Sequence, residues 1–140
     1  MNEPMKKNFR YYTPLLAIII PIVLFTFGLY FMMSNISETE YFDLGDEPVP
    51  AIYITAGKKQ IYNYKQNVHN EYETIILSYR ELSNDEIKEY IEYLVTDGYK
   101  LESEDYDEGF AYLTKETSAG IIGIQVNNQP SAMIKYHISK

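Results

Sequence analysis

The chain has 140 residues, no cysteine and a formal net charge of −8 at pH 7. Residues 1–10 have a net charge of +2 and residues 11–37 contain no charged side chain, so residues 38–140 carry a net charge near −10. An acidic surface repels a phosphate backbone, which argues against nucleic acid as a partner. Without cysteine there are no disulfides, so a folded domain must rely on its hydrophobic core.

The segment that follows the basic start is long and apolar enough to span a bilayer. Leu15–Met33 is almost continuously apolar. At ~1.5 Å per helical residue it is about 28 Å long, close to the ~30 Å hydrocarbon core of a bilayer. The sequence therefore predicts a transmembrane helix over residues 11–33 and the lipid bilayer as a partner.

The flanks of this segment predict its orientation. Lys6, Lys7 and Arg10 precede it, whereas the residues just after it are acidic. Basic flanks stay on the cytoplasmic side, so residues 1–10 are expected in the cytoplasm and the C-terminal domain outside the cell. A cleaved signal peptide is the alternative. The apolar run is longer than the usual ~7–15 residues, and no A-x-A-like cleavage site follows it.

Three residues within the predicted helix suggest a second role for it. Pro21 removes one backbone hydrogen bond, so a kink is expected there. Thr26 and Gly28 offer a small surface to another helix, although no G-x-x-x-G pattern is present. The alternatives are a simple tether and a helix that docks into a larger membrane complex.

The region after the anchor is predicted as a linker and one domain. Residues 34–50 are polar, acidic and contain proline, as linkers do, so the folded domain is expected over residues 51–140. Residues 51–55 and 60–65 show strand patterns on either side of the turn-prone Ala56-Gly57-Lys58-Lys59. This arrangement predicts a β-hairpin.

A helix is predicted over residues 84–97. Ser83 and Glu86 form a capping-box pair, in which each side chain bonds to the backbone N–H of the other residue. Gly98 can adopt the positive φ that ends many helices. One apolar stripe recurs at helical spacing along this segment: Ile87, Tyr90, Ile91 and Leu94.

Strand patterns precede and follow this helix, at residues 72–80, 99–104, 109–116, 120–127 and 131–139. Short connections imply antiparallel neighbours. We therefore expect an α+β fold: one N-terminal transmembrane helix, then a two-layer domain with one helix on one face of a mainly antiparallel sheet, in the order β-β-β-α-β-β-β-β. Tyr79, Tyr90 and Tyr136 fall on the predicted core faces.

The overall plan resembles small single-pass membrane-anchored extracytoplasmic proteins of Gram-positive bacteria. The stretch from Tyr72 to Ile138 carries the resemblance, including the helix that ends Tyr93-Leu94-Val95-Thr96-Asp97-Gly98-Tyr99. The resemblance implies a location in the cell envelope. It implies no activity and no functional residue.

The densest group of charges is an acidic run whose carboxylates are Glu104, Asp105, Asp107 and Glu108, beside Glu102. Carboxylate oxygens suit a hard cation such as Ca²⁺, but the EF-hand register fails here. The two interpretations are a weak cation loop and a solvated hairpin tip. A surface hydrolase that uses carboxylates of this run is a further alternative.

Signals for other chemistry are lacking in the sequence. His69 and His137 have no second histidine at zinc-ligand spacing, and His137 falls on the polar parity of the last strand. There is no G-x-S-x-G, no S-x-x-K and no glycine-rich phosphate loop. We therefore expect neither catalytic activity nor a cofactor.

Tyrosine is frequent, with 15 residues, and three tyrosines are candidate binding residues. Tyr53 has outward parity on the first predicted strand, and Tyr62 and Tyr64 share one parity on the second. Together they predict a ridge that binds a protein or a glycan, since tyrosine is enriched at interfaces. The alternative is that these rings pack within a half-buried sheet.

These observations favour a membrane-anchored extracytoplasmic module that binds another envelope protein or polymer. The alternatives are an accessory subunit that acts through its transmembrane helix and a surface hydrolase. The sequence leaves the oligomeric state open.

Overall fold

The computed structural model describes the backbone of residues 3–105 and 109–140, and the side chains of residues 12–105 and 109–140. The predicted acidic residues Asp107 and Glu108 lie outside these ranges. The chain forms two compact units, residues 1–33 and residues 34–140, and each is considered by itself.

The first unit consists of helix α1, Glu3–Ser37, whose last turn belongs to the second unit. The helix continues through both Pro14 and Pro21. Its segment Tyr12–Ser37 is long and apolar enough to cross a membrane. Leucine, isoleucine and phenylalanine side chains along this segment are exposed, as a lipid-facing surface requires. The predicted N-terminal helix is confirmed, and the chain holds a candidate membrane span.

The second unit is built on one antiparallel sheet of six strands. In the spatial order of the sheet, the strands are β3 Ile61–Val68, β4 Tyr72–Tyr79, β8 Ala132–Ser139, β7 Gly120–Asn127, β6 Phe110–Thr117 and β5 Lys100–Asp105. The last four strands form the predicted meander. Strand β8 pairs with β4 and so joins this meander to the β3–β4 hairpin in one open sheet. The α+β fold is confirmed.

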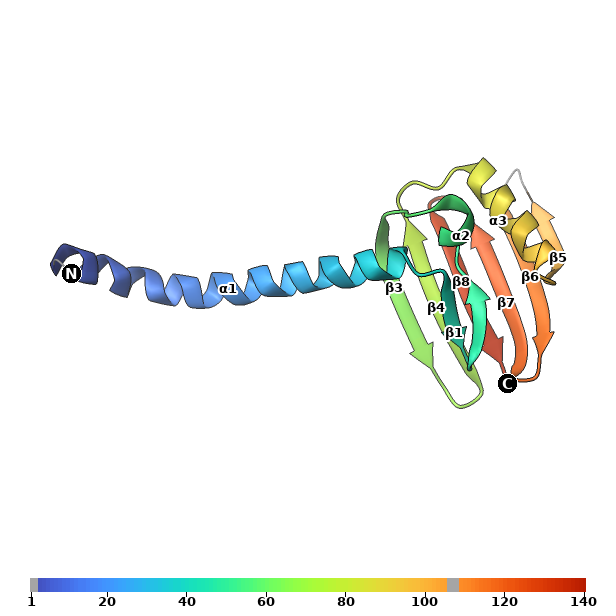
Figure 1. Ribbon diagram of the computed structural model, residues 1–140, viewed down its shortest axis with the longest axis horizontal. Helices are drawn as coiled ribbons and strands as arrows, with labels where there is room; N and C mark the ends of the chain where they lie inside the picture. The colour runs from blue at the N-terminus through green and yellow to red at the C-terminus, as the bar shows by residue number, and fades with distance from the viewer. Residues whose placement is uncertain (1–2, 106–108) are drawn as a thin grey trace. The chain divides into compact units, whose positions relative to one another are not determined.

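One face of the sheet carries the core, and we call it the covered face. Helix α3, Asn84–Thr96, crosses it, and the short helix α2, Tyr53–Ala56, lies on the same side (Figure 1). On β7 every second residue faces the core, at Ile122, Ile124 and Val126, and β8 repeats this pattern. Tyr79, Tyr90 and Tyr136 are buried there, as predicted.

Helix α3 begins and ends where the sequence predicts. The Ser83 side chain accepts from the Glu86 N–H at 3.2 Å, and the Ser83 N–H donates to Glu86 at 2.9 Å. Such an N-cap is worth about 1 kcal/mol. Gly98 has φ +98° and the Tyr99 N–H returns to the Leu94 carbonyl, which ends the helix.

The prediction of a linker over residues 34–50 is wrong. These residues include the last turn of α1 and a hairpin of β1, Tyr41–Leu44, and β2, Glu47–Pro50. Gly45 and Asp46 both have positive φ, at 57° and 69°, which is the two-residue turn that suits a twisted hairpin. Phe42, Leu44 and Val49 are buried. The acidic, proline-containing composition of this segment therefore gave no indication of a pair of strands that contributes to the core.

Two buried tyrosines join this hairpin to the rest of the fold. The Tyr90 hydroxyl donates to the Pro50 carbonyl at 2.6 Å and lies 3.1 Å from the Tyr136 hydroxyl. Because Tyr90 gives its proton to Pro50, Tyr136 is the donor between the two tyrosines. The Tyr136 ring also packs against the Phe42 ring, with 5.4 Å between the ring centroids. Burial raises the pKa of both tyrosines well above the ordinary value, so the hydroxyls stay protonated.

The predicted strand over residues 51–55 is also wrong, because these residues form α2 and its approach. Ile52 is buried immediately before the helix, which begins at Tyr53. The apolar residue that contacts the core is therefore at the start of a helical turn and not on a strand. The predicted hairpin partner, β3, pairs instead with β4. Alternation over five residues does not distinguish a strand from two buried residues followed by one helical turn.

Candidate functional site

The sheet has a second face, which we call the open face. In Figure 1, α2, α3 and the β1–β2 hairpin all lie on the covered face, and no described element of residues 34–140 lies on the other. Strand register assigns the open face of the four inner strands to Tyr72, Thr74, Ile76, Ser78, Phe110, Tyr112, Thr114, Glu116, Ile121, Gly123, Gln125, Asn127, Met133, Lys135, His137 and Ser139.

The open face of the four inner strands carries little charge. Among the open-face positions just given, the charged residues are Glu116 and Lys135, which balance each other. Residues 38–140 as a whole carry a net charge near −10. The exposed side of α3 illustrates the contrast, because it presents Asp85, Lys88, Glu89 and Glu92. Scarcity of charge together with aromatic residues and methionine is the composition of an interface core.

The centre of the open face is built around Gly123. A Cβ placed on Gly123 would lie 2.1 Å from Cε1 of His137 and 2.9 Å from the Tyr112 hydroxyl. The His137 imidazole thus occupies the space that a side chain at residue 123 would take. It lies parallel to the Tyr112 ring, with 4° between the planes and 6.0 Å between the centroids. A glycine in a central strand is therefore required here for close packing.

The His137 side chain is held in its neutral form. Burial and then the charge of Lys135 lower the pKa of His137 below 6.5. Nε2 lies 3.4 Å from the Tyr112 hydroxyl, and the buried Nδ1 has no hydrogen-bond partner within the described structure. An imidazole that is neutral near pH 7 adds no charge to the face. A neutral imidazole can form hydrogen bonds with an uncharged partner.

The three candidate tyrosines do not form the predicted ridge. Tyr53 lies on α2. A bulge in β3 leaves Ile61 opposite Tyr79 but Asn63 opposite Ser78, so Tyr62 is the inserted residue. Tyr64, opposite Leu77, therefore has covered-face parity, although its ring is only half-buried.

The bulge places Tyr62 on the other side of the sheet from Tyr64. Its hydroxyl donates to the Ser131 side chain at 3.0 Å, at the margin of the open face. Of the three predicted tyrosines, Tyr62 is thus the one that borders this face. One inserted residue inverted the parity on which the predicted ridge depended.

The described part of the acidic run does not form a cluster. Glu104 pairs with Ala111 and Asp105 pairs with Phe110, so the two carboxylates point to opposite faces of β5. Among the described residues, no group of three metal-ligating side chains lies together. A cation site that also uses Asp107 and Glu108 extends beyond the described residues.

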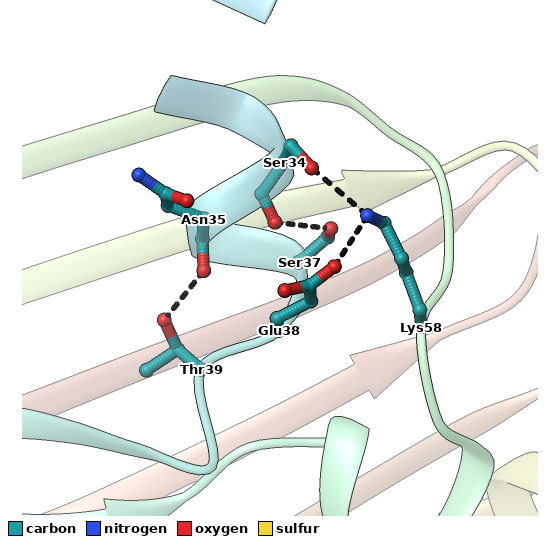
Figure 2. Close-up of polar contacts among 6 residues, drawn as sticks. All are labelled: Ser34, Asn35, Ser37, Glu38, Thr39 and Lys58. Atoms are coloured by element: carbon teal, nitrogen blue, oxygen red, sulfur yellow. Dashed lines mark hydrogen bonds and ion pairs between the residues drawn. The ribbon is translucent and has the colours of Figure 1, made fainter. Parts of the chain in front are cut away.

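A second polar cluster surrounds the end of α1 (Figure 2). The Lys58 ammonium donates to the Ser34 hydroxyl at 2.9 Å and forms an ion pair with Glu38. Ser37 is buried, and its hydroxyl donates to the Ser34 carbonyl at 2.7 Å. The last turn of α1 has no basic residue of its own, so Lys58 supplies the cation that favours a helix C-terminus.

Two of the residues suggested for helix docking, Thr26 and Gly28, lie within α1. The Thr26 hydroxyl bonds to backbone carbonyls of its own helix, those of Ile22 and Val23. A Cβ added to Gly28 would meet no atom within 4 Å. Both residues are compatible with a helix in lipid and with a helix that packs against another.

Comparison with known proteins gives no match, whether to a family model, a curated protein or a solved structure. The function of this chain is therefore inferred from its own geometry and charge.

The open face itself was not predicted from the sequence. The sequence shows the alternation of apolar and polar residues along each strand, and it places His137 correctly on the polar side of its strand. The signal that identifies the face is the scarcity of charge at those positions on four separate strands. It becomes apparent only when the register places the strands side by side.

Proposed function

We propose that this protein is a membrane-anchored module of the cell envelope that binds another envelope component through the open face of its sheet. The candidate span of α1 provides the anchor. Basic residues before it and acidic residues after it favour a cytoplasmic N-terminus and an extracytoplasmic domain. This location also fits the resemblance to small extracytoplasmic proteins of Gram-positive bacteria.

One observation carries the proposal: the open face is neutral and partly apolar in a strongly acidic domain. A solvent-exposed sheet face that serves solubility alone would carry charge, as the exposed side of α3 does. A face that has no net charge and carries Phe110, Tyr112 and Met133 instead has the side chains that interfaces favour. The ligand is therefore an uncharged or weakly charged surface, and nucleic acid is disfavoured.

The face offers hydrogen bonding as well as apolar contact. Gln125 and Asn127 on β7 are both half-exposed, and Gln125 lies diagonally across from the neutral His137. Amide groups both donate and accept hydrogen bonds, so they add specificity without charge. These groups support binding and require no bond-breaking chemistry.

A photo-crosslinking amino acid tests this proposal in the intact membrane. We would place it at Gln125 on the open face and, as the matched control, at Glu89 on the exposed side of α3. The proposal predicts a discrete adduct from position 125 and none from position 89. Adducts of equal yield from both positions, or none from 125, would contradict it.

The orientation is tested separately with a membrane-impermeant maleimide, because the chain has no cysteine of its own. Glu89→Cys should react in intact cells if the domain is extracytoplasmic. Reaction only after the cells are broken would place the domain inside and remove the envelope from the proposal.

A further inference from the structure

We infer that the partner on the open face is a second copy of this chain, so that two domains pack face to face as a four-layer homodimer. This inference rests on the proposed function, because it uses the same face. It commits to one occupant, and four features of the domain argue for that occupant.

The size of the face matches what a stable dimer needs. Most strands of the sheet have eight residues, which at ~3.4 Å per residue give a length of about 27 Å. Six strands at ~4.8 Å spacing are about 24 Å across, so the flat footprint is about 650 Å². Accessible area exceeds a flat footprint because side chains are uneven. A standard interface buries about 800 Å² per partner, which this face can provide.

The charge distribution favours a second copy over a basic partner. Two domains that each carry a net charge near −10 repel one another at most approaches. The open face has no net charge, so this repulsion is weakest there. Its charged residues are Glu116 and Lys135 on the inner strands and Lys65, Lys100, Glu102 and Asp105 on the edge strands. A basic partner would instead bind the acidic remainder of the domain, and it would gain nothing from a neutral face.

The centre of the face is shaped for sheet-on-sheet packing. The His137 ring fills the space over Gly123 and lies parallel to Tyr112. The space over Gly123 is thus filled by a flat ring, and Lys135 is the charged residue of the open face on the two middle strands β7 and β8. Two such faces can approach to the ~10 Å spacing of stacked sheets.

The edges of the sheet disfavour the other common way in which two sheets join. The edge strands β3 and β5 each contain a register shift, between Ile61 and Asn63 and between Leu101 and Ser103. Bulges in edge strands interrupt the row of free backbone groups and oppose edge-to-edge pairing. Self-association through the face is therefore favoured over extension of the sheet.

The membrane anchor strengthens a weak contact. Tethering of two copies in one bilayer raises their effective concentration, so a face of modest affinity can be occupied.

The test uses the full chain in membranes, with two copies that carry different affinity tags. Each copy receives one cysteine at the same position and is treated with a short bismaleimide linker. We expect Gln125→Cys and Thr74→Cys, both on the open face, to give dimers that contain both tags. Glu89→Cys on α3 serves as the control for random collision and should give at least fivefold less.

A charge inserted into the face provides the second measurement. Asn127→Asp added to Thr74→Cys should lower the yield of crosslinked dimer several-fold, because it places an unpaired negative charge in the contact, opposite the uncharged Met133 and Phe110. Asn127→Gln is the matched neutral control and should leave the yield unchanged. Equal effects of the two substitutions would overturn the inference.

The outcomes separate this inference from the proposed function. Equal dimer yields from Gln125→Cys and Glu89→Cys, or no dimer from either open-face position, overturn self-association. If the open-face positions crosslink only to a different molecule, self-association is wrong and the proposed function stands. If the open-face positions give neither a dimer nor an adduct with the photo-crosslinker, self-association and the proposed function are both wrong.

Discussion

The covered face and the open face come from the same strands, and they differ in what limits their composition. On the covered face, Leu77, Leu113 and Ile134 are completely buried and the tyrosine hydroxyls are paired. On the open face the side chains are mostly half-exposed, and nothing in the folding of the domain requires them to be uncharged. We infer that the covered face determines stability and that the open face is available for binding.

The comparison predicts unequal costs for truncation at neighbouring positions of one strand. Ile134→Ala removes a fully buried side chain from the covered face and should lower the free energy of unfolding by about 2–5 kcal/mol. Met133→Ala, the adjacent open-face residue, should cost clearly less. Denaturant unfolding of the full chain in detergent micelles measures both. Equal losses would mean that the two faces do not differ in this way.

A second prediction concerns the buried hydroxyl that joins the β1–β2 hairpin to α3. Tyr90→Phe leaves the Pro50 carbonyl and the Tyr136 hydroxyl with one partner fewer, at a cost of about 1–3 kcal/mol. Tyr112→Phe removes a longer contact to His137 on the open face and serves as the control. The same unfolding assay should rank Tyr90→Phe as the more damaging, and the reverse order would contradict this assignment.

Gly123 allows a sharper test within the open face. Gly123→Ala should destabilise the domain by about 1 kcal/mol or more, because the new Cβ overlaps the His137 ring. The same substitution in a His137→Ala background should cost much less, since the ring is gone. A double-mutant cycle measures this difference. Simple additivity would show that the ring does not lie over Gly123.

The smallest expected effect is a dependence of stability on pH. The pKa of His137 is lowered in the folded state, so the unfolded chain binds this proton more tightly. Stability that is complete above about pH 6.5 should fall as the pH decreases toward the lower folded pKa. Unfolding midpoints between pH 7.5 and 5.5 should decline more for the natural chain than for His137→Ala. Identical slopes would remove His137 as the cause.

Regular elements of this fold could be predicted from the sequence because their signals are local. The capping box and apolar stripe located α3 to within one residue of its end, and the turn residues located the four strands of the meander. Helix α1 followed from length and hydropathy alone. In each case the pattern repeats within the element itself.

The misassigned regions depend on contacts that are distant in sequence. Phe42 and Val49 are buried because Tyr136 and the rest of the core lie against their hairpin, and nothing within residues 34–50 indicates that core. The predicted Tyr53–Tyr62–Tyr64 ridge failed because one segment is helical and a bulge separates the other two tyrosines. A single inserted residue leaves almost no trace in composition, yet it exchanges the faces of a strand.

The most direct test of the central claim compares the accessibility of the two sides of the domain in intact cells. A membrane-impermeant maleimide should label both Glu89→Cys and Gln125→Cys. The quantity to compare is the labelling rate of Gln125→Cys divided by that of Glu89→Cys. We expect this ratio to be several-fold lower in cells than in purified protein that has one copy per lipid nanodisc. An unchanged ratio, or failure of Glu89→Cys to react with intact cells, would contradict it.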